Sequence, residues 1–168
     1  VSITLVVLLC VLMLYRVTMS MMQNECVNGT NVLAYELTSY SGDEDKTALL
    51  DALKQEMGCE FTIFHGDERA YTTIQQNGQR AVGTRLSSEL AEVVLKQGRS
   101  YVGKAAILGE DHLCSYVPTY DENGEVDGLI FAGISMASAT EQIGLTVALS
   151  WLAGIVRIIA GILVARAY

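Results

Sequence analysis

Two segments that are predicted to be β-strands carry side chains suited to binding a small polar molecule. Strand alternation places His112, Cys114 and Tyr116 together on one face of the first segment. In the other segment, alternation places Tyr101 and Lys104 on opposite faces. A buried carboxylate needs charge-assisted donors to offset its desolvation, and a cation, an imidazole and Tyr hydroxyls are such donors. The pattern therefore predicts a pocket for a small, polar and anionic ligand.

The same residues allow a second interpretation, in which Cys114 is a nucleophile and His112 or His65 is its base. No third group that would orient the base and no oxyanion loop is evident in the sequence. The sequence has no Cys-x-x-Cys pair and no His at ligand spacing, so it does not predict a metal or haem site. We therefore expect a protein that is not an enzyme and that needs no metal or other cofactor.

Four cysteines, Cys10, Cys26, Cys59 and Cys114, are scattered along the chain. A disulfide between Cys26 and Cys59 would join the first helix to the first strand in an oxidising compartment. Free, buried thiols are the alternative. A thiol-based redox sensor that uses Cys26, Cys59 and Cys114 is a further hypothesis for function.

Apolar segments lie at both ends of the chain. Residues 1–22 carry one charge, Arg16, and lack the basic region and cleavage site of a signal peptide, so they predict a transmembrane helix. Residues 143–164 predict a second span. Arg166 follows its last residues, and the positive-inside tendency would place that arginine in the cytoplasm. Arg157 lies within this span, and we expect its side chain to snorkel toward the headgroups.

Residues 23–142 hold all nineteen acidic residues and eight Lys or Arg, a net charge of −11. Nucleic acid is therefore excluded as an expected partner. The predicted organisation is a transmembrane helix at 1–22, an extracytoplasmic domain at 23–142 and a second transmembrane helix at 143–168. This describes a two-pass protein of the cell (inner) membrane, with one compact domain outside the cytoplasm.

Hydrophobic periodicity within 23–142 predicts an α+β domain. Helical spacing predicts a continuation of the first helix over 23–40 and a helix at 43–57, with acidic residues in its first turn and Gly58 after its end. A third helix is predicted at 86–97, with Ser87 as N-cap and Gly98 as its stop. Five β-branched or aromatic runs predict strands: 59–65, 69–75, 100–108, 111–120 and 128–136.

The predicted connections carry residues that tolerate positive φ, such as Asn77-Gly78 and Asn123-Gly124. Four blocks along these elements, starting at Phe61, Asn77, Val94 and Ser115, read FTIFHGDERA, NGQRAVGTR, VLKQGRSYVGKA and SYVPTYDENGEVDG. Together they resemble the single Cache sensor domain of bacterial methyl-accepting chemotaxis proteins and related transmembrane receptors. The resemblance implies a PAS-like, five-stranded antiparallel sheet with a long N-terminal helix, here flanked by two transmembrane helices.

The resemblance also implies a function. It predicts an extracytoplasmic domain of a chemoreceptor that binds a small molecule and signals through the second transmembrane helix. A membrane histidine kinase or a cyclase is the alternative output, and the cytoplasmic signalling domain lies outside this sequence. Receptors of this type are homodimers packed along their N-terminal helices, which implies a partner face that includes Met19, Met21, Met22 and residues 32–37. A short carboxylate is the leading ligand, followed by amino acids and by an accessory binding protein.

By resemblance, the pocket lies between the sheet and the segment that holds the third helix. The residues that this implies as pocket lining are Arg80, Tyr101, Lys104, His112 and Tyr116, with Phe64, Arg69 and Tyr71 behind them. Lys104 is the favoured contact for an anion. An ion pair with Asp or Glu is the alternative role for Arg80 and Lys104, and a half-buried core position is the alternative for the two tyrosines of the first group.

Overall fold

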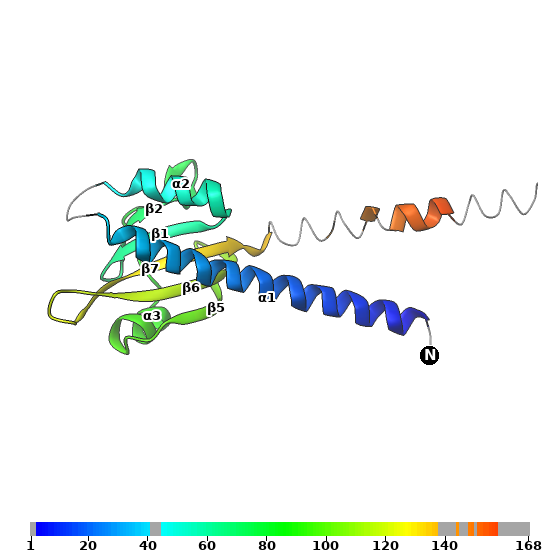
Figure 1. The fold of residues 1–168 in the computed structure, drawn as a ribbon, viewed down its shortest axis with the longest axis horizontal. Helices are drawn as coiled ribbons and strands as arrows, with labels where there is room; N and C mark the ends of the chain where they lie inside the picture. Colours follow the sequence, from blue (N-terminus) through cyan, green and yellow to red (C-terminus); the bar gives the residue numbers. More distant parts are fainter. Residues whose placement is uncertain (1–2, 41–44, 138–143, 145–147, 150, 158–168) are drawn as a thin grey trace, which may run out of the picture. The chain divides into compact units, whose positions relative to one another are not determined.

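The computed structural model describes residues 3–40, 45–137, 144, 148–149 and 151–157 (Figure 1). The chain divides into two units, Val1–Ile134 and Ser135–Tyr168. The first unit contains the α+β domain. The predicted second span at 143–164 lies largely outside the described residues, of which 144, 148–149 and 151–157 are helical.

Helix α1 (Ile3–Leu37) is long enough to serve two purposes. Its 35 residues extend roughly 50 Å, against a bilayer hydrocarbon core of about 30 Å. By length and composition, Leu5–Leu37 is one candidate membrane span among the described residues. Its apolar side chains near the N-terminus are exposed, whereas Cys26, Thr30 and Leu33 are buried against the sheet. The C-terminal half of α1 is therefore part of the domain core.

The sheet has five strands in the order β2-β1-β7-β6-β5. These strands are β1 (Glu60–His65), β2 (Glu68–Thr72), β5 (Tyr101–Ile107), β6 (Glu110–Tyr120) and β7 (Val126–Ser135). Pairs β1–β2, β1–β7 and β5–β6 are antiparallel. The five-stranded antiparallel sheet with a long N-terminal helix confirms the predicted PAS-like domain.

Each face of the sheet has its own core. On one face, α1 and α2 (Thr47–Met57) cover Phe61, Ile63, Ile130 and Ala132. On the opposite face, α3 (Ser88–Leu90) and the π-helix η1 (Ala91–Lys96) cover a second cluster. The sheet residues of that cluster are Phe64, Cys114, Tyr116, Leu129 and Phe131. Strand alternation thus gives the sheet one face that α1 and α2 cover and one face that residues 81–96 cover. Figure 1 shows α1 and α3 beside the sheet.

Strand β6 connects the two faces through neighbouring residues. On the α1 side, the Thr30 and Ser115 hydroxyls are hydrogen-bonded at 2.9 Å, and the Cys26 thiol donates to the Leu113 carbonyl at 3.3 Å. The next residue, Tyr116, points to the opposite face and is 1% exposed. A displacement of β6 on either face therefore reaches the other directly.

Several element boundaries differ from the prediction. The second helix begins at Thr47, so the acidic residues expected in its first turn precede it, and Asp45 accepts a hydrogen bond from the Thr47 N–H at 2.9 Å. Gly58 ends α2 in the left-handed conformation, as expected (φ 71°). The predicted helix at 86–97 has Ser87 as N-cap but continues as a π-helix, with i→i−5 bonding from Gln97 N–H to the Glu92 carbonyl.

A short hairpin was not predicted as strands. Strands β3 (Gln75–Gln76) and β4 (Gln79–Arg80) pair with each other and form a separate two-stranded sheet. Their turn is Asn77-Gly78, with φ of 52° and 77°, which matches the positive-φ turn expected at this dipeptide. The predicted strand at 69–75 therefore ends at Thr72, before the hairpin.

The predicted partner face of the first helix needs a correction. Met21, Val32 and Tyr35 are exposed, but Leu33 is fully buried within the domain's own core, and Leu37 is partly buried against the same core. A residue that packs on the sheet of its own chain is not available to a partner helix, so Leu33 does not belong to that face.

Gly128 allows the close approach of β7 and β1. A Cβ at this position would lie 2.1 Å from the backbone oxygen of Phe64. We expect Gly128→Ala to lower the free energy of unfolding by about 3 kcal/mol, because a backbone atom cannot move aside without breaking the ladder. Urea unfolding followed by circular dichroism measures this loss.

Gly103→Ala is the matched control, since its Cβ would meet the movable Tyr101 hydroxyl at 3.0 Å. Equal losses in the two variants would contradict the explanation for Gly128.

Candidate functional site

Arg69 is the most unusual polar side chain in the described part of the domain. It lies on β2 opposite Phe64 of β1, and it is 3% exposed. Its Nη1 donates to the Thr84 hydroxyl, whereas its Nε is buried without a hydrogen-bond partner among the described residues. No carboxylate of those residues pairs with it. A buried guanidinium without an anion is energetically costly and is suited to bind one.

The local sequence explains this position. The Arg69 N–H donates to the Thr84 carbonyl at 2.9 Å, and the Gly83 N–H donates to the Arg69 carbonyl at 2.9 Å. These two bonds hold the 83–84 backbone beside β2, which places the Thr84 hydroxyl at the guanidinium. Gly83 adopts a φ of 79°, a conformation that glycine accepts readily.

Aromatic rings surround the guanidinium. Its central carbon lies 5.0 Å from the centroid of the Phe64 ring, within cation–π range. Tyr116, from β6, is buried and packs against Phe131 with ring centroids 5.0 Å apart, and against Tyr101 at 6.2 Å. These rings make a dry environment in which an ionic hydrogen bond is stronger than in water.

The electrostatics of this face follow from burial. Burial lowers the pKa of Arg69, and the neighbouring Tyr116 partly opposes that shift. Burial also raises the pKa of the Tyr116 phenol and raises the pKa of the Cys114 thiol to about 12. At neutral pH the phenol and the thiol are uncharged, so Arg69 supplies the positive charge of this cluster.

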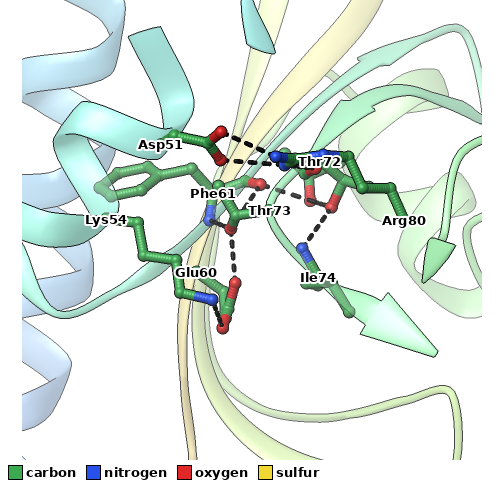
Figure 2. Close-up of polar contacts among 9 residues, drawn as sticks. Asp51, Lys54, Glu60, Phe61, Thr72, Thr73, Ile74 and Arg80 are labelled. Atoms are coloured by element: carbon green, nitrogen blue, oxygen red, sulfur yellow. Dashed lines mark hydrogen bonds and ion pairs between the residues drawn. The ribbon is translucent and has the colours of Figure 1, made fainter. Parts of the chain in front are cut away.

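Arg80, which was predicted to line the pocket, is held elsewhere. Figure 2 shows its guanidinium paired side by side with the Asp51 carboxylate of α2, at 2.9 and 2.7 Å, while Nη1 also donates to the Thr72 carbonyl at 2.9 Å. Asp51 raises the pKa of Arg80. The alternative role that the sequence allowed, an ion pair with an acidic residue, is the one that the structure shows.

The same network ties α2 to the start of the sheet. The Lys54 ammonium donates to the Glu60 carboxylate at 2.6 Å, and the Thr73 hydroxyl lies at 2.5 Å from the other oxygen of Glu60 (Figure 2). Thr73 also accepts a hydrogen bond from the Phe61 N–H at 2.9 Å. This network is structural, because its charged groups are already paired.

Tyr101 and Lys104 both line a surface groove of about 420 Å³ between η1 and β5, with Ser87, Glu89, Leu90, Val93, Ala105 and Ala106. Within β5, Tyr101 lies opposite Tyr116 and packs on the same core, as expected. Its hydroxyl donates to the Lys104 carbonyl at 2.7 Å. Lys104 lies opposite Leu113 and is exposed at the groove, and no described contact joins it to Arg69.

The remaining predicted residues, His112 and Tyr71, lie on opposite faces of the sheet. His112 is buried on the Tyr116 side, with its Nδ1 at 2.9 Å from the Glu110 carbonyl. Tyr71 lies opposite Ile63 and packs on the α1 and α2 face, where Lys46 contacts its ring at 5.5 Å. The site therefore combines Arg69, Phe64, Tyr101 and Tyr116 from the predicted set.

Thr84 and Phe131 belong to the candidate site and were not predicted. Strand alternation could have indicated Phe131, because it lies two residues from Leu129 in the predicted strand at 128–136. Thr84 follows the glycine turn, and no sequence pattern indicates that its hydroxyl meets Arg69.

Cys26, Cys59 and Cys114 are free and buried, so the disulfide between Cys26 and Cys59 is not formed in this structure. Reactive redox cysteines are exposed and have a low pKa, which is the opposite of Cys114. No group of three or more His, Cys, Asp or Glu side chains among the described residues is placed to hold a metal.

Replacing Arg69 tests whether its guanidinium is unsatisfied. We expect Arg69→Met to raise the free energy of unfolding of the unliganded chain by about 1–3 kcal/mol, because it removes a buried, unpaired charge at similar side-chain length. Denaturant unfolding measures the change.

Arg85→Met is the control for this change, since Arg85 is exposed and its pair with Asp67 contributes little. A clear loss of stability in Arg69→Met would show that the guanidinium already has sufficient partners.

Comparisons with known proteins agree with this architecture. The sensor domain of DcuS from E. coli superposes with a TM-score of 0.55 and 18% identity, over 76% of this chain and 98% of that domain. Sensor protein CitS of Halalkalibacterium halodurans is 27% identical over 124 residues, which are 72% of this chain. The chain spans 22% of the length of that relative.

A family model provides the assignment. The model described as single cache domain 3 matches residues 43–145, from before α2 to beyond β7. It thus covers the whole sheet and the Arg69 cluster, and it matches more than half of the chain. The chain belongs to the single Cache domain 3 family.

Proposed function

We propose that residues 23–142 are the extracytoplasmic ligand-sensing domain of a transmembrane sensor, and that the ligand is a small carboxylate bound at Arg69. The observation that carries this proposal is the buried Arg69 guanidinium with an unpartnered Nε. A carboxylate accepts two parallel hydrogen bonds from the Nε and Nη2 edge of a guanidinium. Nη1 is already used by Thr84, and this leaves that edge for a ligand.

The proposed membrane arrangement is a transmembrane helix at 1–22 and a second at 143–168. The candidate span in α1 and the concentration of acidic residues in 23–142 support it. The relative in Halalkalibacterium halodurans is a sensor protein, and this favours a sensor of that kind over the chemoreceptor that the sequence predicted. We propose no catalytic role for the domain itself.

The proposed signal passes along two routes. Tyr116 on the proposed ligand face is adjacent along β6 to Ser115. The Ser115 hydroxyl is hydrogen-bonded to the Thr30 hydroxyl of α1. Strand β7 ends at Ser135 and is followed immediately by the helical residues Met136 and Ala137. A ligand that prefers one arrangement of these strands shifts their equilibrium by its difference in affinity for the two states. A homodimer formed along α1 would receive that shift at its exposed apolar positions.

Isothermal titration of the full chain in mild detergent tests the ligand proposal. We expect a panel of small carboxylates, amino acids and nucleobases to yield binding for a carboxylate. Arg69→Gln should weaken this binding at least about 30-fold, since truncating one partner of a buried charge pair costs about 2 kcal/mol or more.

Arg85→Gln and Lys104→Gln are the controls, because both remove an exposed cation away from the cluster. Loss of binding in Lys104→Gln with retention in Arg69→Gln would place the ligand in the groove beside β5 instead.

A further inference from the structure

The ligand face of the sheet offers one positive charge. Arg69 provides it, and its Nε and Nη2 form no hydrogen bond with a described residue. The other cations of the domain have contacts or positions away from the Arg69 cluster. Four of them pair with carboxylates: Lys54, Arg80, Arg85 and Lys96. Arg99 donates to the Gln97 side chain, Lys46 lies over the Tyr71 ring, and Lys104 is exposed at the groove beside β5.

His112 shares the Tyr116 side of β6 but lies at its far end. It pairs with Ala105, whereas Tyr116 pairs with Tyr101. Four residues along a strand separate His112 from Tyr116 by roughly 13 Å. Its Nδ1 contacts the Glu110 carbonyl, so the ring is held at that end. A short ligand anchored between Arg69 and Tyr116 does not reach it.

The rest of the environment is apolar and buried. The sheet contributes Phe64, Phe131 and Leu129, which are at most 1% exposed. The covering segment contributes Leu86, Leu90 and Val94. The Tyr116 hydroxyl is a neutral polar group of this cluster, whereas the Thr84 hydroxyl already donates to the Ala81 carbonyl at 2.7 Å. Such surroundings fit a small apolar or hydroxylated body, and a second carboxylate there would lose its hydration without a cation to replace it.

From this arrangement we propose that the domain selects short-chain monocarboxylates and rejects dicarboxylates and tricarboxylates of similar length. The proposal rests on the proposed function, because it assigns the class of ligand to the same site. One carboxylate matches the free edge of Arg69, and the uncharged remainder packs against the aromatic rings. The selectivity follows from the absence of a second cation beside Arg69 among the described residues.

A matched set of probes tests this selectivity in the full, unmodified chain. Isothermal titration is performed with acetate, propionate, pyruvate, lactate, succinate, monomethyl succinate and citrate. We expect a monocarboxylate to bind at least about tenfold more tightly than succinate or citrate, a difference of about 1.4 kcal/mol. Monomethyl succinate should bind more tightly than succinate, because the ester removes the second charge at nearly the same length.

Each outcome decides between the two proposals. Tighter or equal binding of succinate or citrate would overturn the monocarboxylate proposal and leave the carboxylate sensor intact. Silence across all seven compounds would overturn both. Weakening of the preferred probe by Arg69→Lys, which keeps the charge but loses the paired donors, would support the bidentate anchor. Unchanged affinity in that variant would contradict it.

Discussion

The Arg69 guanidinium is held away from water on the face of the sheet that residues 81–96 cover, and no carboxylate of the described chain neutralises it. A charge in such a position is retained only when something compensates for its lost hydration. Thr84 and the Phe64 ring compensate in part. The unpartnered Nε is where we propose that an anion binds, and the neighbouring Tyr116 and Phe131 rings are buried there.

The packing of the domain separates the proposed place of binding from the proposed place of output. One face of the sheet is covered by α1 and α2, and the other by the segment around α3 and η1. Because β6 alternates between the faces, Tyr116 and Ser115 belong to different cores while sharing one peptide bond. The Ser115 and Thr30 hydroxyl pair then connects β6 to the helix that we propose to cross the membrane. The network of Asp51, Arg80 and Lys54 keeps α2 fixed to the sheet, which favours movement of the strands over movement of α2.

Much of the fold was predictable because it depends on local rules. The two-residue period of strands placed His112, Cys114 and Tyr116 on one face, and the register with β5 confirms it. Gly58 ends its helix as expected because the left-handed conformation there favours glycine. The π-helix was not predictable, since the 86–97 segment has the apolar spacing of an ordinary helix.

The candidate site was predicted only in part, because it depends on tertiary contacts that the sequence does not show. Arg69 was included, but behind the pocket, because the sequence does not show which strand lies beside which. Lys104 was favoured by its charge, although alternation already placed it on the other side from Tyr101. Arg80 was included as a cation, but its partner Asp51 is 29 positions away on α2. Charge alone indicates that a residue can bind an anion, and tertiary contacts decide which cation is left without a partner.

Nuclear magnetic resonance of the arginine Nε–H groups tests the central claim most directly. The full chain, labelled with ¹⁵N-arginine and assigned with the Arg69→Lys variant, would be titrated with the carboxylate that binds best. Our account predicts a large change in the Arg69 Nε–H resonance with slower exchange with water, while the Arg80 resonance stays in place. A ligand-dependent change at Arg80 with an unchanged Arg69 signal would contradict it.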